Sequence, residues 1–224
     1  TVNGKSIIER QLSILKQNSI LDIIIITGPH HEKFNFEKIR YIRDKNFLEH
    51  DQLGSLISAK KEINDDLIIL FGDIIFENVV LAKILESKSD ISIAVDMNWA
   101  RTYTSKPDGS FDKADKVRFE QENVSRIFKT MTEADKKFEI GEFIGLIKLS
   151  KNGSKQLVEC YEKIQNVHKG KFHDAISLEK AKLVDILQEL IENKIRVDAI
   201  PITGEWCEID TEEDLEIAKK KFVG

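Results

Sequence analysis

Two acidic stretches that lie far apart in the chain hold the residues best suited to chemistry. Asp73 follows the apolar run at residues 67–71, and Glu208 and Asp210 stand in the segment EWCEIDTEEDL. Hard cations such as Mg²⁺ bind one or two carboxylates together with phosphate oxygens. Acids that converge from distant parts of a chain are what metal-assisted phosphoryl or nucleotidyl transfer requires. The alternative is that all three acids are ordinary strand ends.

The elements that must position these acids are helices and strands in alternation. Apolar residues at helical spacing predict helices at residues 4–19, 51–63, 78–87, 153–165 and 181–193, and from Thr211 onward. Apolar runs predict strands at residues 22–28, 66–73, 90–96, 141–150 and 197–204. The alternation predicts an α/β fold with a doubly wound, mixed and mostly parallel sheet and helices on both faces. The strand at 22–28 lacks apolar–polar alternation, so we expect burial on both of its faces.

The middle of the chain follows a different pattern. Residues 115–129, DKVRFEQENVSRIFK, alternate in part and contain Glu122 and Asn123 as turn residues, which predicts an antiparallel hairpin. Near the end of the chain, Thr211 and Asp214 have the spacing of a capping box at a helix start.

Composition excludes several classes of protein. No apolar stretch reaches the ~20 residues of a membrane-spanning helix, and the net charge of −5 argues against a general nucleic-acid binder. Cys160 and Cys207 lack the spacing of a disulfide framework or a metal site, which fits a reducing cytoplasm. The adjacent His30 and His31 would diverge on a strand or a helix, so we interpret them as solvated loop residues. The other histidines have no partner visible in the sequence.

Ligands of open α/β sheets bind at the carboxyl ends of the strands. These ends are ITGPHH, LFGDIIF, AVDMNW and ITGEWCEID, and three of the four contain an acid. Glu208 and Asp210 alternate along a strand, which would place both on one face. Either could be the second metal ligand beside Asp73, while the other caps the next helix. Gly72 would let a substrate approach the backbone.

Longer motifs add a resemblance to a known family. LIILFGDIIFEN, GEWCEIDTEEDLEIAKK and VNGKSIIERQLSIL resemble motifs of the nucleotidyltransferases that act on sugar-1-phosphates and choline phosphate. DISIAVDMNW, GEFIGLIKLS and LVDILQELIENKIRVDAIPITGEWCEID are similar to the nucleotidyltransferase domains found with phosphoenolpyruvate mutases, and to cytidylyltransferases. The resemblance runs along nearly the whole chain. It implies the Rossmann-like fold of the nucleotide-diphospho-sugar transferases.

The sequence also departs from the family. The Gly-rich loop that binds the triphosphate through backbone N–H groups, together with its preceding strand, is absent from residues 1–224. We therefore expect a single nucleotidyltransferase domain at 1–224 that is N-terminally incomplete, with residues 97–150 as an antiparallel layer that binds the acceptor. The non-methionine start favours a fragment over a protein that has lost this activity.

The resemblance implies roles for individual residues. Asp73 resembles the first metal ligand and a catalytic residue, with Glu208 or Asp210 as the second ligand. Lys129 matches a lysine that holds the acceptor phosphate, and Glu142 an acceptor-binding acid. The remaining positions implied for the acceptor are Asp96, Asn98 and Trp99, and those implied for the nucleotide are Gly28, Gly54, Ser55 and Gly72.

The activity implied is transfer of CMP from CTP to a phosphate or phosphonate acceptor, such as aminoethylphosphonate or phosphocholine, with release of pyrophosphate. Mg²⁺ would be the cofactor, and neither nucleic acid nor a membrane is expected as a partner; a homo-oligomer stays open. Three alternatives remain: a sugar-1-phosphate nucleotidyltransferase, a metal-dependent glycosyltransferase, and a non-catalytic nucleotide-binding domain. FGDIIF lacks the first acid of the D-x-D strand end that such glycosyltransferases usually carry.

Overall fold

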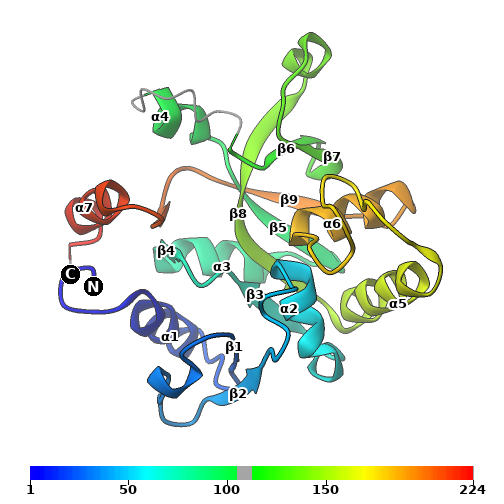
Figure 1. Cartoon of the computed structure of the whole chain (residues 1–224). Helices are drawn as coiled ribbons and strands as arrows, with labels where there is room; N and C mark the ends of the chain where they lie inside the picture. Colours follow the sequence, from blue (N-terminus) through cyan, green and yellow to red (C-terminus); the bar gives the residue numbers. More distant parts are fainter. Residues whose placement is uncertain (105–112, 224) are drawn as a thin grey trace. The chain divides into compact units, whose positions relative to one another are not determined.

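The computed structural model describes residues 1–104 and 113–223 of the chain (Figure 1). The chain divides into two compact units, each assembled from separate segments. Unit 1 comprises Thr1–Ser19, Ile68–Leu149 and Arg196–Gly224, and unit 2 comprises Ile20–Leu67 and Ser150–Ile195. In the part of the chain described, no helix is both long and apolar enough to cross a membrane.

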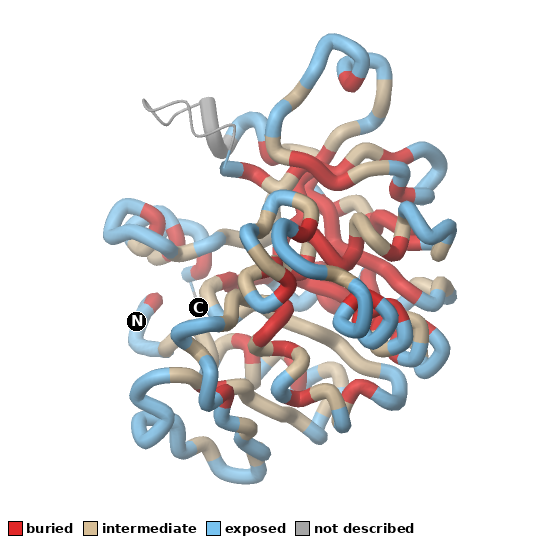
Figure 2. The backbone as a smooth tube through the Cα atoms, turned by 45° about the vertical axis from the view of Figure 1, so that its right-hand side comes forward, coloured by how far each residue is buried: buried red, intermediate tan, exposed pale blue. Residues whose placement is uncertain are grey.

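Unit 1 is built on a mixed sheet of six strands in the order β3-β8-β5-β9-β7-β6. Their bounds are Leu67–Leu70, Glu139–Leu149, Ile91–Asp96, Asp198–Ile202, Asn123–Phe128 and Lys116–Glu120. β5 pairs parallel with β9 and antiparallel with β8, while β6 pairs antiparallel with β7 and β8. All six residues of β5 are buried, and Figure 2 shows buried residues concentrated along the strands of this sheet. The core of unit 1 therefore lies at the sheet.

A second, two-stranded sheet in unit 1 brings the end of the chain back to its middle. β4 (Ile74–Phe76) pairs antiparallel with β10 (Trp206–Glu208). Helices of unit 1 are α1 (Ile7–Gln17), α3 (Asn78–Glu86), α4 (Trp99–Thr104) and α7 (Glu212–Lys221), and η4 is a 3-10 turn at Glu133–Lys137. α1 packs on β4, and α3 packs on β5 and β9. The pairing places the end of β10 beside the turn that contains Asp73.

Unit 2 combines a two-stranded parallel sheet with three α-helices. β1 (Ile24–Thr27) pairs with β2 (Arg40–Arg43). The helices are α2 (Gln52–Ser58), α5 (Lys151–Val167) and α6 (Leu183–Glu192), with 3-10 turns η1 (His31–Lys33) and η2 (Lys60–Glu62). α6 packs against both α5 and α2.

Most of the predicted elements are present. Thr211 and Asp214 form the predicted capping box at the start of α7, and the antiparallel hairpin is formed by β6 and β7. Its turn was predicted one residue too late. Gln121 and Glu122 occupy the turn, with φ values of 48° and 70°, because a two-residue hairpin turn of type I′ requires positive φ at both positions.

Two further predictions about strands need correction. Ile24 to Ile26 of β1 are half-buried, not buried on both faces, because this strand pairs with β2 in a sheet of only two strands. The strands β2, β4 and β10 were not predicted. β4 and β10 have three residues each, too few for alternation to be recognised.

Candidate active site

Three carboxylates converge in unit 1 where the small sheet ends. Oxygen atoms of Asp73, Glu208 and Asp210 all lie within 4.8 Å of one another. The antiparallel pairing of β4 with β10 produces this arrangement, since Glu208 is the partner of Ile74. The N–H of Ile209 donates a hydrogen bond to the carbonyl oxygen of Asp73 at 2.9 Å. The predicted convergence of these acids is therefore present in the structure.

Hydrogen bonds from α1 fix the turn that carries Asp73. The side-chain amide of Gln11, which is buried, donates hydrogen bonds to the carbonyl oxygens of Phe71 at 2.8 Å and Ile74 at 2.7 Å. Both carbonyls flank the short segment Gly72–Asp73. A buried amide that satisfies two backbone acceptors fixes their positions, so Asp73 is placed by a rigid support.

The electrostatics of the cluster disfavour three negative charges. Burial raises the pKa of Glu208 to about 7, and repulsion from Asp210 and Asp73 adds to the effect. Burial also raises the pKa of Asp73, with repulsion from Asp210 as a smaller cause. Mutually repelling carboxylates that lose hydration need a compensating positive charge.

One oxygen of the cluster also lacks a hydrogen-bond donor. Oδ1 of Asp73 is buried and accepts no hydrogen bond from any residue that the structure describes. Buried polar atoms in native proteins are rarely left without a partner. An all-oxygen set of carboxylates with an orphaned buried oxygen fits a hard divalent cation such as Mg²⁺.

Lys129 pairs with an acid that acts electrostatically on the cluster. Nζ of Lys129, just after β7, is 3.6 Å from Oδ1 of Asp115, just before β6. Asp115 contributes to the raised pKa of Glu208, which places it within electrostatic range of the cluster. The Lys129 side chain is 37% exposed, so its ammonium group is open to an anionic ligand. Sequence reasoning identified Lys129 but missed Asp115.

The predicted residues Asp96 and Glu142 form one row across the six-stranded sheet with Lys116. Asp96 of β5 is the Cα partner of Glu142 of β8, and Glu142 is the partner of Lys116 of β6. All three are buried, with at most 4% of their surface exposed. The Nζ of Lys116 also lies 5.4 Å from the centroid of the Trp99 ring. Lys116 was not predicted as a site residue.

Both oxygens of Asp96 are engaged inside the protein. Oδ1 accepts the N–H of Asn98 at 2.9 Å, and Oδ2 accepts the indole N–H of Trp206 at 2.8 Å. Trp206 is the first residue of β10, two positions before Glu208. The hydrogen bond therefore links the charged row to the strand that carries Glu208 and leads into Asp210. Sequence reasoning did not single out Trp206.

Trp99 opens α4 and is 7% exposed. Its indole N–H donates to the carbonyl oxygen of Ile140 at 3.2 Å. Trp99 packs with Ala114 in a small apolar cluster. A ring fixed in this way can line a pocket but does not swing freely over one.

The glycines and the serine predicted to bind nucleotide lie in different surroundings. A Cβ on Gly54 would stand 2.7 Å from Cγ of His50, and one on Gly28 would stand 3.3 Å from Cβ of Phe47. The hydroxyl of Ser55 donates to Asp44 at 2.8 Å. These three positions belong to unit 2, whereas Gly72 belongs to unit 1 beside the acids. Apart from its chain neighbours, no heavy atom of the described residues lies within 4 Å of a Cβ built on Gly72, which leaves room for a ligand.

The histidine pair follows β1, in the segment that begins with Gly28. His30 and His31 are exposed, and each lies 3.5 Å from a different oxygen of Glu32. This is the solvated loop that the sequence predicted.

Comparison with known proteins gives the relatives of this chain. No protein-family model matches the chain. Over 232 aligned residues it is 24% identical to the CTP:phosphoglutamine cytidylyltransferase of Campylobacter jejuni, covering 97% of this chain and 88% of that one. A shorter stretch, 35% of this chain and 36% of the relative, is 32% identical to the choline-phosphate cytidylyltransferase of Streptococcus pneumoniae.

Solved structures show the same fold. The inositol-1-phosphate CTP transferase of T. maritima matches with a TM-score of 0.67 at 16% identity, covering 97% of this chain and 84% of that chain. The CTP:phosphocholine cytidylyltransferase of Streptococcus pneumoniae matches with a TM-score of 0.70 at 16% identity, covering 98% of this chain and 86% of that chain. These likenesses confirm the predicted α/β fold, and the sequence relatives confirm the predicted resemblance.

Proposed function

We propose that this chain, which is similar to cytidylyltransferases, transfers CMP from CTP to a small phosphorylated or phosphonate acceptor, releasing pyrophosphate. The observation that carries the proposal is the cluster of Asp73, Glu208 and Asp210, whose oxygens lie within 4.8 Å of one another. Negative charge builds up on the phosphate that is attacked in a nucleotidyl transfer, and a metal ion held by such a cluster would neutralise it.

Each residue of the site has a defined part in the proposed reaction. A bound Mg²⁺ would supply charge neutralisation at the reacting phosphate groups. Asp73, with Glu208 or Asp210, would hold this ion, and the Gln11 amide would keep Asp73 in position. The ammonium group of Lys129 would leave Asp115 in part to contact the acceptor phosphate.

No side chain is required as a nucleophile. An oxygen of the acceptor's phosphate or phosphonate attacks the α-phosphorus of CTP, and pyrophosphate leaves with the electron pair of the broken P–O bond. The protein contributes in-line positioning and charge neutralisation. Gly72 has open space around it, so a phosphate could approach the backbone beside Asp73.

The identity of the acceptor is the finer part of the proposal. The relatives are named for phosphoglutamine, phosphocholine and inositol-1-phosphate; each consists of a phosphate ester or amide on a small polar group. The buried row of Asp96, Glu142 and Lys116 is engaged inside the protein, with both Asp96 oxygens hydrogen-bonded. It therefore does not select among these acceptors, and the acceptor is left to the test below.

The test crosses each of the four NTPs with phosphoglutamine, phosphocholine, aminoethylphosphonate, hydroxyethylphosphonate, inositol-1-phosphate and glucose-1-phosphate, and follows pyrophosphate release. It is run with and without Mg²⁺ on residues 1–224 and on the natural full-length protein. We expect Mg²⁺-dependent release with CTP and one of the first five acceptors. Silence with every pair, while nucleotide still binds, would instead identify a non-catalytic nucleotide-binding domain. Release only with glucose-1-phosphate would identify a sugar-1-phosphate nucleotidyltransferase.

A further inference from the structure

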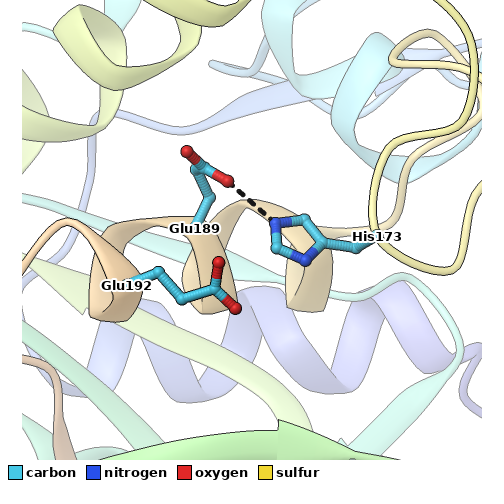
Figure 3. Close-up of side chains that lie close together, drawn as sticks. All are labelled: His173, Glu189 and Glu192. Atoms are coloured by element: carbon cyan, nitrogen blue, oxygen red, sulfur yellow. Dashed lines mark hydrogen bonds and ion pairs between the residues drawn. The ribbon is translucent and has the colours of Figure 1, made fainter.

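A second cluster of metal-binding residue types lies in unit 2 and includes none of the residues assigned above. His173, Glu189 and Glu192 each offer one ligand atom, and these atoms lie within 4.8 Å of one another. Figure 3 shows the three side chains converging, the two glutamates from α6 and the histidine from the segment before it. Nε2 of His173 lies 2.9 Å from Oε2 of Glu189.

Each carboxylate is oriented by an amide on the same helix. The Nδ2 of Asn193 donates to Oε1 of Glu189 at 2.9 Å, and the Nε2 of Gln188 donates to Oε1 of Glu192 at 2.8 Å. One oxygen of each glutamate is therefore held by an amide. Metal ligands are typically oriented by hydrogen bonds of this kind from neighbouring groups.

The histidine is placed by a constrained turn. His173 has a φ of 48°, an unusual value for a residue other than glycine. The turn is closed by two backbone hydrogen bonds between Phe172 and Ala175, at 3.0 and 2.9 Å. The buried ring of Phe172 packs edge-on against the imidazole, with centroids 4.6 Å apart. The following N–H, of Asp174, donates at 3.3 Å to Asp185 in the first turn of α6.

Glu189 also acts electrostatically on a residue of α5. Glu189 is one of the charges that raise the pKa of the buried Cys160 thiol on α5, after burial itself. The carboxylate thus extends its negative potential to the α5–α6 packing contact. Two carboxylates with no Lys or Arg ion pair recorded for them among the described residues gather around one imidazole.

We propose that His173, Glu189 and Glu192 form a binding site for a zinc ion that ties the turn around His173 to α6. One imidazole nitrogen and two carboxylate oxygens are a ligand set that Zn²⁺ accepts, with a fourth position left for water. Mg²⁺ prefers oxygen ligands alone, so this site and the carboxylate cluster of unit 1 select different metals.

The geometry needs only a small adjustment. Bonds of about 2.1 Å to a tetrahedral ion separate its ligand atoms by roughly 3.4 Å. Nε2 of His173 and Oε2 of Glu189, now at 2.9 Å, would move apart by about half an ångström. The proton between them would be displaced, leaving the imidazole neutral with its proton on Nδ1. The ligand oxygen of Glu192, which lies within 4.8 Å of both other ligand atoms, would take the same separation of roughly 3.4 Å.

The test is zinc titration by calorimetry on Asp73→Asn, which weakens competition from the carboxylate cluster of unit 1. A second variant adds His173→Gln, a third adds Glu192→Gln, and a matched control adds His168→Gln. His168 also packs edge-on against the Phe172 ring, with centroids 5.3 Å apart, but is outside the ligand set. The imidazole NMR resonances of His173 are followed in parallel.

We expect Asp73→Asn to bind one zinc ion, with a shift of the His173 Nε2 resonance. His173→Gln and Glu192→Gln should each weaken this binding by at least roughly tenfold, as losses of metal-site residues do, whereas His168→Gln should not. Glu192 is exposed, so Glu192→Gln keeps the test informative if His173→Gln unfolds. Equal zinc affinity in all variants, no zinc binding, or an unshifted His173 resonance would show a plain ion pair between His173 and Glu189. None of these readouts depends on nucleotidyl transfer.

Discussion

Glu208→Gln should make the metal-free protein more stable at alkaline pH. Burial and the repulsion from Asp210 and Asp73 raise the pKa of Glu208 from 4.5 to about 7. Because the folded-state pKa lies above the unfolded one, the stability associated with the protonated group is present below pH 4.5. It is lost as the pH rises through 7. Glutamine has the shape of the protonated acid and no charge, so the variant escapes this loss.

The pKa shift of Glu208 sets the size of the expected change in the free energy of unfolding. A change from 4.5 to about 7 corresponds to about 3 kcal/mol at full strength. Glu208 is nevertheless exposed to solvent, so screening by water reduces such effects to about 1 kcal/mol. We therefore expect Glu208→Gln to match the wild type at pH 4 and to exceed it by about 1 kcal/mol at pH 8.

Urea unfolding at both pH values, in EDTA and again in excess Mg²⁺, measures this difference. Added Mg²⁺ should stabilise the wild type at pH 8 more than it stabilises Glu208→Gln, because the ion compensates the charge that the variant lacks. As a matched control, Glu212→Gln changes an acid in the first turn of α7 outside the cluster. Parallel pH profiles for the wild type and Glu208→Gln, or a less stable variant at pH 8 in EDTA, would refute the reasoning.

Three further predictions concern two residues of unit 1 and one of unit 2. Lys129→Ala should raise the KM for the acceptor at least roughly tenfold and leave the KM for CTP nearly unchanged, since the ammonium group is assigned to the acceptor phosphate; equal changes in both would contradict that assignment. Trp206→Phe leaves an oxygen of the buried Asp96 without its indole donor, and urea unfolding should show a loss of about 1–3 kcal/mol, with a loss below 0.5 kcal/mol as the contrary result. Gly54→Ala places a Cβ 2.7 Å from Cγ of His50 and should lower stability by about 1–3 kcal/mol; Gly72→Ala, with open space around it, is the control, and equal losses would show that packing at Gly54 is not the cause.

Local signals were sufficient to predict most helices of the fold. The capping box of Thr211 and Asp214 is visible in four consecutive residues, and the structure confirms it. The hairpin of β6 and β7 was also predictable, although the turn residues were not, because Gln121 and Glu122 are not the residues usually found at positive φ.

The candidate site was predictable only in part. Asp73 could be identified because it follows an apolar run, and Glu208 and Asp210 because they alternate in the segment after the last predicted strand; the rule for strand ends places such residues at one edge. Asp115, Lys116 and Trp206 could not be identified in this way. Their positions depend on which strands pair and in which register, as in the row that joins Asp96 to Lys116 through Glu142, and register is a long-range property.

The cluster of unit 2 illustrates the same limit. His173 and Glu189 are 16 residues apart, with no spacing that marks a metal site. The tight turn at His173 brings them together, and its φ of 48° has no signal in the sequence, since glycine or asparagine would be the expected residue there.

The most direct test of the account is formation of the CMP-linked product from CTP and the preferred acceptor, measured by mass spectrometry for the natural full-length protein and its Asp73→Asn variant. With Mg²⁺ present, we expect the wild type to form the product and Asp73→Asn to form it at least roughly a hundredfold more slowly, with circular dichroism unchanged. Product formed by the variant at the wild-type rate, or by the wild type equally well in EDTA, would contradict a catalytic metal site at Asp73, Glu208 and Asp210.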